Sequence, residues 1–458
     1  MRVRPIRHPG PPAVTAALLL VLALLSGPGP ASAAEPSRPN VLLIVLDDAT
    51  YRGALDMLAD SRARIVGSVG VAYRQSYVAI PSCCPERATL MTGQFPHNSG
   101  VRQQQLGGTL DKTRTLPADL HRAGYRTYHV GKYLHEPLAT NPPAGVYDRW
   151  LIGLDGYVDP YFNLDGAIRR ITGYTTAITG DYARRFLASA ETADDGQPWY
   201  VSLNFKAPHR ESTPEARYAS LAVPSLTFPD ELDRSDKPAY VRVMNATAAD
   251  MAPLRRDMWR TLASVDDQVV LTLDWLATHG ELANTLVILT SDNGFHHGQN
   301  RRQEKFVPYT PALQVPLWLR GPRVVAGGTN TTRMVSGVDV AATIYDATGA
   351  APSRVQDGQS LLRTSARTEV FAEYFHDEVN LRTVPHWATV RGATWQYIET
   401  YDVSTGARIF REWYDLAADP HMLRNLLADG DSTNDPSTSA VASRLVAYRT
   451  CTGSACPR

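Results

Sequence analysis

The sequence predicts an α/β fold: a large mixed, mostly parallel β-sheet sandwiched by helices, followed by a smaller C-terminal subdomain with an antiparallel sheet. Three observations support this prediction. Short apolar runs of strand length recur along the chain, segments with helical apolar spacing separate them, and polar residues follow each run. The length of 458 residues is enough for one large domain and a smaller one.

The first 34 residues are typical of a secretory signal peptide. Three arginines lie within the first seven residues, residues 13–25 are apolar, and residues 31–34 form a cleavage site of small side chains. The apolar run is shorter than the roughly 20 residues that span a bilayer. We therefore expect residues 1–34 to be removed, and the mature protein to be secreted with no membrane attachment.

Four short apolar runs predict buried strands of the parallel sheet. They are residues 41–46, 125–130, 200–205 and 286–289. Thr115, Pro117 and Gly124 supply the N-cap, first-turn proline and glycine stop of a short helix over residues 118–123. Apolar residues at intervals of three or four over residues 251–276 predict one long amphipathic helix that leads into the last strand.

The chain changes character near residue 366. Short segments rich in aromatic and β-branched residues predict antiparallel strands there. These segments are residues 369–375, 387–390, 395–401 and 408–413. We therefore expect a main domain over residues 35–365 and a C-terminal subdomain over residues 366–458.

Composition and cysteine positions narrow the class of protein. Lysine plus arginine and aspartate plus glutamate both number 46, which argues against a nucleic-acid-binding protein. Cys451 and Cys456 lie close together near the C-terminus, and in an exported protein they predict a disulfide that fixes the tail. Cys83 and Cys84 are adjacent, and neighbouring cysteines rarely form a structural disulfide.

Polar side chains follow all four predicted parallel strands. The acids and the amide among them are Asp47, Asp48, Asp292 and Asn293, and the basic residues are Lys132 and His209. Ligands of open α/β sheets bind at the carboxyl ends of the strands, so we expect these side chains to meet. Carboxylate and amide oxygens suit Ca²⁺ or Mg²⁺ rather than zinc.

The stretch from Cys83 to Gly93 carries the most specific motif of the chain, because Cys83, Pro85 and Arg87 form the pattern Cys-x-Pro-x-Arg. Chance would produce that pattern roughly 0.02 times in a sequence with this composition. Pro85 suits the first turn of a helix, which places Cys83 at a helix N-terminus where free N–H groups favour an anion.

The motif resembles the signature of the formylglycine-dependent (type I) sulfatases, and the resemblance covers most of the chain after residue 34. It includes Asp47-Asp48, Gly131-Lys132-Tyr133-Leu134, Ala207-Pro208-His209, Ser291-Asp292-Asn293-Gly294, Lys305, Val315-Pro316-Leu317 and residues 414–420. The Cys-Cys pair, His97-Asn98 and Gly-Lys-Tyr-Leu look most like the glucosamine-6-sulfatase and arylsulfatase-like branch, which also includes the extracellular heparan sulfatases.

The resemblance implies an alkaline-phosphatase-like fold and a modified nucleophile. Cys83 would be oxidised to formylglycine by a formylglycine-generating enzyme before folding. A thiol is a poor ligand for a hard metal ion, whereas the hydrated aldehyde offers two hydroxyls. One Ca²⁺ would be held by Asp47, Asp48, Asp292, Asn293 and the modified Cys83.

The resemblance also implies roles for the neighbouring residues. Arg87 would fix the turn and bind the nucleophile's oxygen, and Lys132 and Lys305 would neutralise the sulfate oxygens. His209, together with Lys305, would protonate or stabilise the leaving alkoxide. Leu134 stands where many relatives have His, so we expect the following residue, His135, to act as a base or a substrate contact.

Beside the metal motif, His296 is expected to reach the pocket. The expected substrate is a sulfated sugar resembling N-acetylglucosamine 6-sulfate, or an aryl sulfate. Two alternatives stay open: a phosphate or phosphonate ester hydrolase of the same superfamily, and an unmodified protein that only binds sulfated glycans. The sequence carries no pattern that fixes the sulfate position, exo or endo action, or the oligomeric state.

Overall fold

A computed structural model describes residues 1–5, 8–10, 38–136, 140–192, 196–379 and 383–457. The chain divides into two units, Met1–Ser37 and Arg38–Arg458, and the fold below is that of the second unit. The predicted signal peptide falls mostly on residues 11–34, outside the described residues. Within the described part of the chain, no helix has the length and apolar character needed to cross a membrane.

The core of the second unit is a ten-stranded sheet with the order β12-β2-β11-β8-β1-β7-β3-β4-β5-β6. Its strands are β1 (Asn40–Asp47), β2 (Gly70–Tyr77), β3 (Arg126–Gly131), β4 (Arg149–Asp155), β5 (Tyr161–Leu164), β6 (Ala167–Arg170), β7 (Trp199–Pro208), β8 (Thr285–Ser291), β11 (Leu317–Arg320) and β12 (Gly328–Ser336). The run from β8 to β4 is parallel, whereas β11, β5 and β6 run antiparallel to their neighbours. The predicted mixed, mostly parallel sheet is therefore confirmed.

Each of the four predicted parallel strands overlaps an observed one. They correspond to β1, β3, β7 and β8, which lie side by side in the middle of the sheet. Val41 of β1 is paired with Tyr200 of β7 on one side and with Leu286 of β8 on the other. Because every residue of β1 is buried, its sequence is apolar on both faces, as expected for a central parallel strand.

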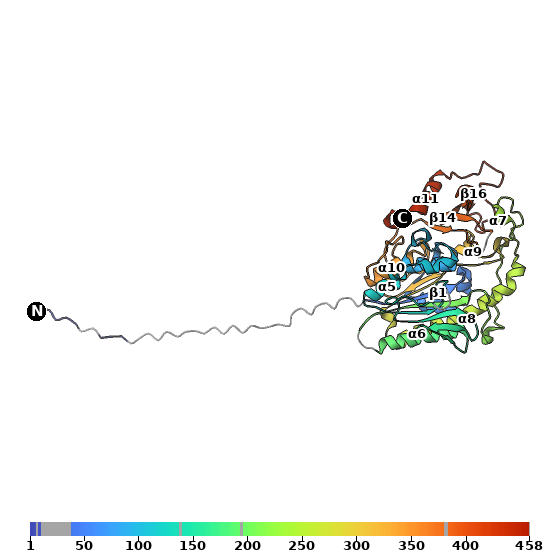
Figure 1. The fold of residues 1–458 in the computed structure, drawn as a ribbon. Helices are drawn as coiled ribbons and strands as arrows, with labels where there is room; N and C mark the ends of the chain where they lie inside the picture. The colour runs from blue at the N-terminus through green and yellow to red at the C-terminus, as the bar shows by residue number, and fades with distance from the viewer. Residues whose placement is uncertain (6–7, 11–37, 137–139, 193–195, 380–382, 458) are drawn as a thin grey trace. The chain divides into compact units, whose positions relative to one another are not determined.

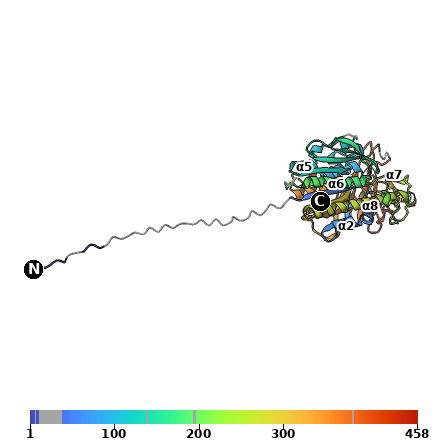
Figure 2. The same cartoon turned by 90° about the horizontal axis from the view of Figure 1, so that it is seen from below.

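Helices cover both faces of this sheet (Figures 1 and 2). One face packs against α1 (Tyr51–Met57), α2 (Ala59–Ile65), α6 (Thr175–Glu191) and α8 (Ala248–Thr278), and the other against α3 (Cys83–Thr92), α5 (Leu116–Arg122) and α10 (Asp339–Thr348). Alternate residues of β1 serve the two faces: Leu42 and Ile44 belong to the first core, Val41 and Leu43 to the second. The long helix expected over residues 251–276 is α8.

The C-terminal part of the unit contains the predicted antiparallel sheet. Its strands pair in chain order: β13 (Glu369–Tyr374), β14 (His386–Gly392), β15 (Trp395–Tyr401) and β16 (Arg408–Asp415). Val390 and Tyr397 of this sheet pack with α11 (Ser439–Thr450). The opposite face joins the main domain, where Trp387 Nε1 donates to Phe306 O at 2.8 Å. The domain boundaries at residues 35 and 366 stay predictions.

The C-terminal tail is closed by the predicted disulfide between Cys451 and Cys456. Its loop is tied to the chain after α3, because Asn98 Nδ2 donates to Cys451 O at 2.8 Å and Gly453 N donates to Asp357 Oδ1 at 2.7 Å. The remaining short elements are α4 (Pro96–Ser99), α7 (Ala239–Arg242), α9 (Thr310–Leu313), β9 (His296–His297), β10 (Gln303–Glu304), η1 (Gln104–Thr109), η2 (Lys112–Arg114), η3 (Ala216–Tyr218), η4 (Leu282–Asn284), η5 (Gln299–Arg301) and η6 (Gly453–Ala455).

Candidate active site

The carboxyl ends of the central parallel strands bring the predicted polar residues to one edge of the sheet. Asp47 is the last residue of β1, Lys132 follows β3, His209 follows β7 and Asp292 follows β8. Because these four strands are neighbours and parallel, side chains from residues 47 to 292 meet at the same edge.

Oxygen atoms dominate the centre of this edge. Single ligand atoms of Asp47, Asp48, Asp292 and Cys83 all lie within 4.8 Å of one another, and all four residues are buried. Asp48 has a left-handed φ of 70°, and its backbone N–H donates to Asp292 Oδ1 at 3.2 Å. This tight turn keeps the two successive acids Asp47 and Asp48 within the same cluster.

Asn293 completes the oxygen cluster. Its Nδ2 donates to Asp48 Oδ1 at 2.6 Å, and its Oδ1 is buried with no hydrogen-bond partner among the described residues. Buried polar atoms are normally paired, so an unpaired carbonyl oxygen beside three carboxylates calls for a positively charged partner. The donor set therefore fits a hard divalent cation such as Ca²⁺.

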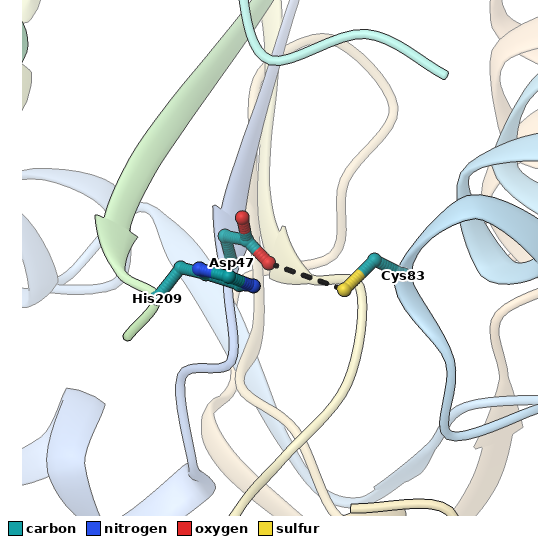
Figure 3. A group of neighbouring side chains, drawn as sticks. All are labelled: Asp47, Cys83 and His209. Atoms are coloured by element: carbon teal, nitrogen blue, oxygen red, sulfur yellow. Dashed lines mark hydrogen bonds between the residues drawn. The ribbon is translucent and has the colours of Figure 1, made fainter. Parts of the chain in front are cut away.

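Cys83 is the first residue of α3, and its sulfur points into the acidic cluster (Figure 3). Cys83 Sγ donates to Asp47 Oδ1 at 3.5 Å, and Lys305 Nζ donates to the sulfur at 2.6 Å. Burial raises the pKa of the Cys83 thiol far above its usual range, although Lys132 and Lys305 oppose this shift. The encoded thiol is therefore neutral and a weak nucleophile at this position.

Three cations neutralise the acids. Lys132 Nζ pairs with Asp47, Lys305 Nζ pairs with Asp48, and Arg87 Nε donates to Asp292 Oδ2 at 2.8 Å. Burial opposes the charged form of Lys305, but Asp48 and the other acids overcome it and raise its pKa. The site therefore carries permanent positive charge that favours an anionic group.

Burial and neighbouring charges also determine the pKa values of Asp292 and Asp47. Burial and then Asp47 raise the pKa of Asp292 to about 6, against the opposing effect of Arg87. For Asp47 burial again acts upward, but Lys132, His209 and Arg87 together bring its pKa below the usual range. Asp47 is therefore ionised at neutral pH, whereas Asp292 binds a proton more readily than an ordinary aspartate.

A cavity of about 490 Å³ opens onto this cluster. It is lined by Asp47, Lys132, His135 and His209, with walls from residues 152–156, from Gln104 and Gln105, and from Val379 of the C-terminal part. His135 is exposed, and its backbone N–H donates to Cys84 Sγ at 3.3 Å. The structure thus brings His135 and His209 to the cavity wall, as the sequence predicts.

His296 lies elsewhere. It is fully buried in β9, its Nδ1 lies 3.2 Å from Glu304 O, and its ring meets Tyr309 edge-on. It does not line the cavity, so the expected approach of His296 to the pocket is not seen. The adjacent His297 is also buried, and its ring lies beside Phe295 and Trp259.

Two further residues hold the site and were not found from the sequence. Asn204 Oδ1 accepts from Arg87 Nη1 at 3.1 Å, and Gln104 Oε1 accepts from the backbone N–H of Cys84 at 3.0 Å. Asn204 is a polar residue inside the apolar run 200–205, which is a signal that could have found it. Gln104 begins the short 3₁₀ helix η1, whose sequence carries no such signal.

Glu86, inside the Cys-x-Pro-x-Arg motif, faces away from the cluster. Its Oε2 accepts from the backbone N–H groups of Ala79 and Ile80 at 3.0 and 3.2 Å. Its carboxyl group therefore fixes the loop that precedes α3 and does not repel an anion at Cys83.

An oxygen cluster, a buried nucleophile position and fixed cations at the open edge of an α/β sheet define a hydrolase of anionic esters. The family model described as Sulfatase matches residues 39–350, and the model described as N-sulphoglucosamine sulphohydrolase, C-terminal, matches residues 298–449. The chain belongs to the sulfatase family and is a hydrolase of sulfuric esters.

The chain is also similar to individual proteins and to solved structures. The chain is 29% identical to N-acetylglucosamine-6-sulfatase of Homo sapiens, over 93% of this chain and 87% of that protein. A structure solved with its substrate D-glucosamine-2-N,6-O-disulfate has a TM-score of 0.75 at 23% identity, covering 89% of this chain and 96% of that one. A phosphonate monoester hydrolase of Agrobacterium radiobacter has a TM-score of 0.68 at 21% identity, covering 89% and 95%. At these identities the two solved structures establish the fold alone.

Proposed function

We propose that this sulfatase is secreted and removes the 6-O-sulfate from glucosamine units of sulfated sugars, using a formylglycine at Cys83 and one Ca²⁺. The observation that carries the proposal is the position of Cys83 Sγ, held between Asp47 Oδ1 at 3.5 Å and Lys305 Nζ at 2.6 Å. A residue in that place contacts both the oxygen cluster and the cations that would bind sulfate.

The properties of the encoded thiol support the modification. Cys83 is buried, its pKa is raised, and its neighbours are hard oxygen donors that suit a hydroxyl better than a sulfur. A formylglycine hydrate would supply two hydroxyls here, one to attack sulfur and a second to release the sulfate afterwards. Conversion would take place before folding, because the folded chain leaves this side chain only 2% exposed.

The oxygen cluster supports the metal. Asp47, Asp48, Asp292 and Asn293 would hold Ca²⁺, and the unpaired, buried Asn293 Oδ1 supports this assignment because a cation would satisfy it. Bound Ca²⁺ would supply Lewis-acid stabilisation of the negative charge on the sulfate and lower the pKa of a coordinated hydroxyl. The ligands are all oxygen atoms, so zinc should be a poor substitute.

The chain's own groups would then place the ester. Lys132, whose side chain is 26% exposed at the cavity, and Lys305 would bind the sulfate oxygens where charge develops. His209 Nδ1 lies 3.1 Å from Arg210 O, so Nε2 is the nitrogen that can exchange a proton with the leaving oxygen. The exposed His135 at the cavity wall is placed to contact the sugar.

The glucosamine 6-sulfate preference rests on the relatives. One matched relative is named N-acetylglucosamine-6-sulfatase, and a fold neighbour was solved with D-glucosamine-2-N,6-O-disulfate as its substrate. A cavity of about 490 Å³ accommodates a sulfated monosaccharide. The second candidate, a phosphonate or phosphate ester hydrolase, is favoured by the phosphonate monoester hydrolase fold neighbour.

The nucleophile and the metal can be tested on the purified active protein. Mass analysis of the peptide containing Cys83 should show the aldehyde, and active protein with only the intact thiol would refute the modification. Removal of Ca²⁺ with a chelator should reduce sulfate release by at least roughly a hundredfold. Added Ca²⁺ should restore the rate, whereas full recovery with zinc would refute the oxygen-ligand assignment.

The substrate is tested with matched esters. Sulfate release from N-acetylglucosamine 6-sulfate and from N-sulfated glucosamine 6-sulfate is compared with that from 4-sulfated and aryl sulfates. A phosphonate monoester of the same aryl alcohol serves as the chemical control. Faster turnover of the phosphonate than of every sulfate would favour the second candidate.

A further inference from the structure

A second, much smaller cavity lies beside Arg87 and shares Lys132, Tyr133 and Leu134 with the larger cavity. Its volume is about 20 Å³, enough for a single water molecule, which needs roughly 10 to 15 Å³. Side chains of the strand core and of α3 surround it: Leu43, Val45, Arg87, Leu90, Met91, His129, Lys132, Tyr133, Leu134, Tyr147, Tyr200, Ser202 and Asn204.

Several polar atoms in this wall are buried and have no hydrogen-bond partner among the described residues. They are Arg87 Nη2, Tyr133 Oη and both ring nitrogens of His129. Arg87, His129 and Tyr133 are only 4%, 3% and 6% exposed. Backbone groups of Gly131 and Lys132 are close enough to affect His129, but no contact of its ring nitrogens has hydrogen-bond geometry. Unpaired donors and acceptors facing one small cavity are the usual surroundings of a structural water.

We propose that this cavity holds one ordered water that links Arg87 Nη2 to the ring of His129, and that His129 is a positioning residue for Arg87. The water would accept from the guanidinium and donate to the imidazole, with the Tyr133 hydroxyl as a further partner. A metal cation is disfavoured here because the Arg87 charge lies in the wall. Burial, and next the charge of Arg87, lowers the pKa of His129 to about 3, so the ring is neutral and offers one acceptor nitrogen.

The water would complete the fixation of a group that touches the reacting centre. Arg87 Nε already holds Asp292 at 2.8 Å, and Arg87 Nη1 holds Lys132 O at 3.0 Å and Asn204 Oδ1 at 3.1 Å. A partner on Nη2 prevents the guanidinium from rotating about these bonds. Without that partner, Arg87 would hold Asp292 and the backbone of Lys132 less rigidly. We expect this to lower kcat more than it weakens substrate binding.

The water itself is tested by a crystal structure at high resolution. We expect one density peak about 2.7–3.2 Å from both Arg87 Nη2 and a nitrogen of His129. A featureless cavity, or a direct bond from Arg87 Nη2 to a protein atom, would overturn the proposal. A crystal soaked in bromide gives the remaining outcome: an anomalous peak at the same place would show an anion site and refute the water.

The positioning role is tested by replacing only the polar ring. His129→Phe should remove the density peak and lower kcat about tenfold, with KM changed less than twofold. His129→Gln keeps a polar group in the wall and should recover most of kcat. Tyr374→Phe is the control, because it deletes a buried and unpartnered hydroxyl in strand β13, outside the small cavity, and should leave kcat unchanged.

The crystal structure and the activity comparison test different parts of the proposal, so one part can be refuted without the other. The activity comparison rests on the proposed role of Arg87 in the site, whereas the density peak does not depend on any substrate or modification. An unchanged kcat in a folded His129→Phe variant refutes the positioning role. If His129→Phe does not fold, His129→Gln and the wild-type density decide the question.

Discussion

Two groups of buried charges lie close together in this chain, and they differ in what surrounds them. The site cluster consists of Asp47, Asp48, Asp292, Lys132 and Lys305. The closed network consists of Glu231, Lys237, Arg302 and Glu412, and it connects residues 231–237 with the C-terminal sheet. Both groups contain acids and bases that are almost completely buried.

Ion pairs and a cation–π contact hold the closed network together, although Glu231 Oε1, Glu412 Oε1 and two nitrogens of Arg302 have no hydrogen-bond partner among the described residues. Arg302 Nη1 donates to Glu231 Oε2 at 3.0 Å, and the guanidinium carbon lies 3.8 Å from the centre of the Tyr309 ring. Lys237 Nζ donates to both carboxylate oxygens of Asp236 and to Leu423 O, each at 2.8 Å. No member of the network lines the cavity of about 490 Å³.

The site cluster, in contrast, opens to that cavity through Asp47 and Lys132. Buried charges and shifted pKa values are common to both groups, so they do not identify a site by themselves. Unpaired polar atoms also occur in both groups, so access to the cavity makes the difference. The following predictions test this distinction, beginning with the largest expected effect.

Cys83→Ala should lower kcat/KM for sulfate ester hydrolysis at least roughly 10⁴-fold, because it removes the proposed nucleophile. The variant should keep its thermal unfolding temperature, since Cys83 belongs to the open cluster and not to the packed core. Cys84→Ala, one residue further along α3, is the matched control and should retain at least a tenth of the activity. Comparable losses in both variants would show that the helix, and not the Cys83 side chain, is the sensitive feature.

Arg302→Met should show the reverse pattern in the closed network. Loss of the guanidinium leaves Glu231 with a weakened partner, and breaking a buried ion pair costs about 3–5 kcal/mol of unfolding free energy. Chemical denaturation measures this loss, while kcat/KM of the folded enzyme should stay within threefold. A large fall in kcat/KM without destabilisation would mean that the network acts on the site, and the distinction would fail.

His297→Gln probes the strand between the two groups. Burial, and then Arg255, lowers the pKa of His297 to about 3, whereas an unfolded histidine titrates near 6.5. Between these values only the unfolded chain binds the proton, so stability falls as the pH is lowered from 6.5. His297→Gln removes this proton uptake by the unfolded chain. The slope of unfolding free energy against pH between 4 and 6 should therefore decrease by about 1.4 kcal/mol per pH unit. An unchanged slope would contradict the burial of a neutral ring.

The sequence was sufficient for the local elements of the fold. Apolar runs located β1, β3, β7 and β8, and regular spacing located α8, because burial of both faces or of one stripe leaves a direct pattern in the residues. The strand order could not be predicted in the same way. Leu46 pairs with Ser291, 245 residues later in the chain, and no local pattern records such a partner.

The candidate site was predictable where motif and strand end coincided, as for Asp47, Cys83 and Asp292. It was not predictable where a side chain's direction decides its role. His296 and His297 are adjacent in β9 and neither lines the cavity, which no local pattern of residues reveals. Gln104 accepts from the Cys84 N–H, and it does so from η1, a short segment whose position depends on tertiary contacts.

β1 and β8 are neighbours in the sheet but lie far apart in the chain, so they are synthesised at different times. The acidic side of the pocket closes only when residue 292 has left the ribosome, and at typical rates of synthesis this is on the order of ten to forty seconds after residue 83. During that interval Cys83 lacks the neighbours that bury it in the finished protein. A fold completed late by its central strand would therefore give the enzyme proposed to oxidise Cys83 a period of access to the nascent chain.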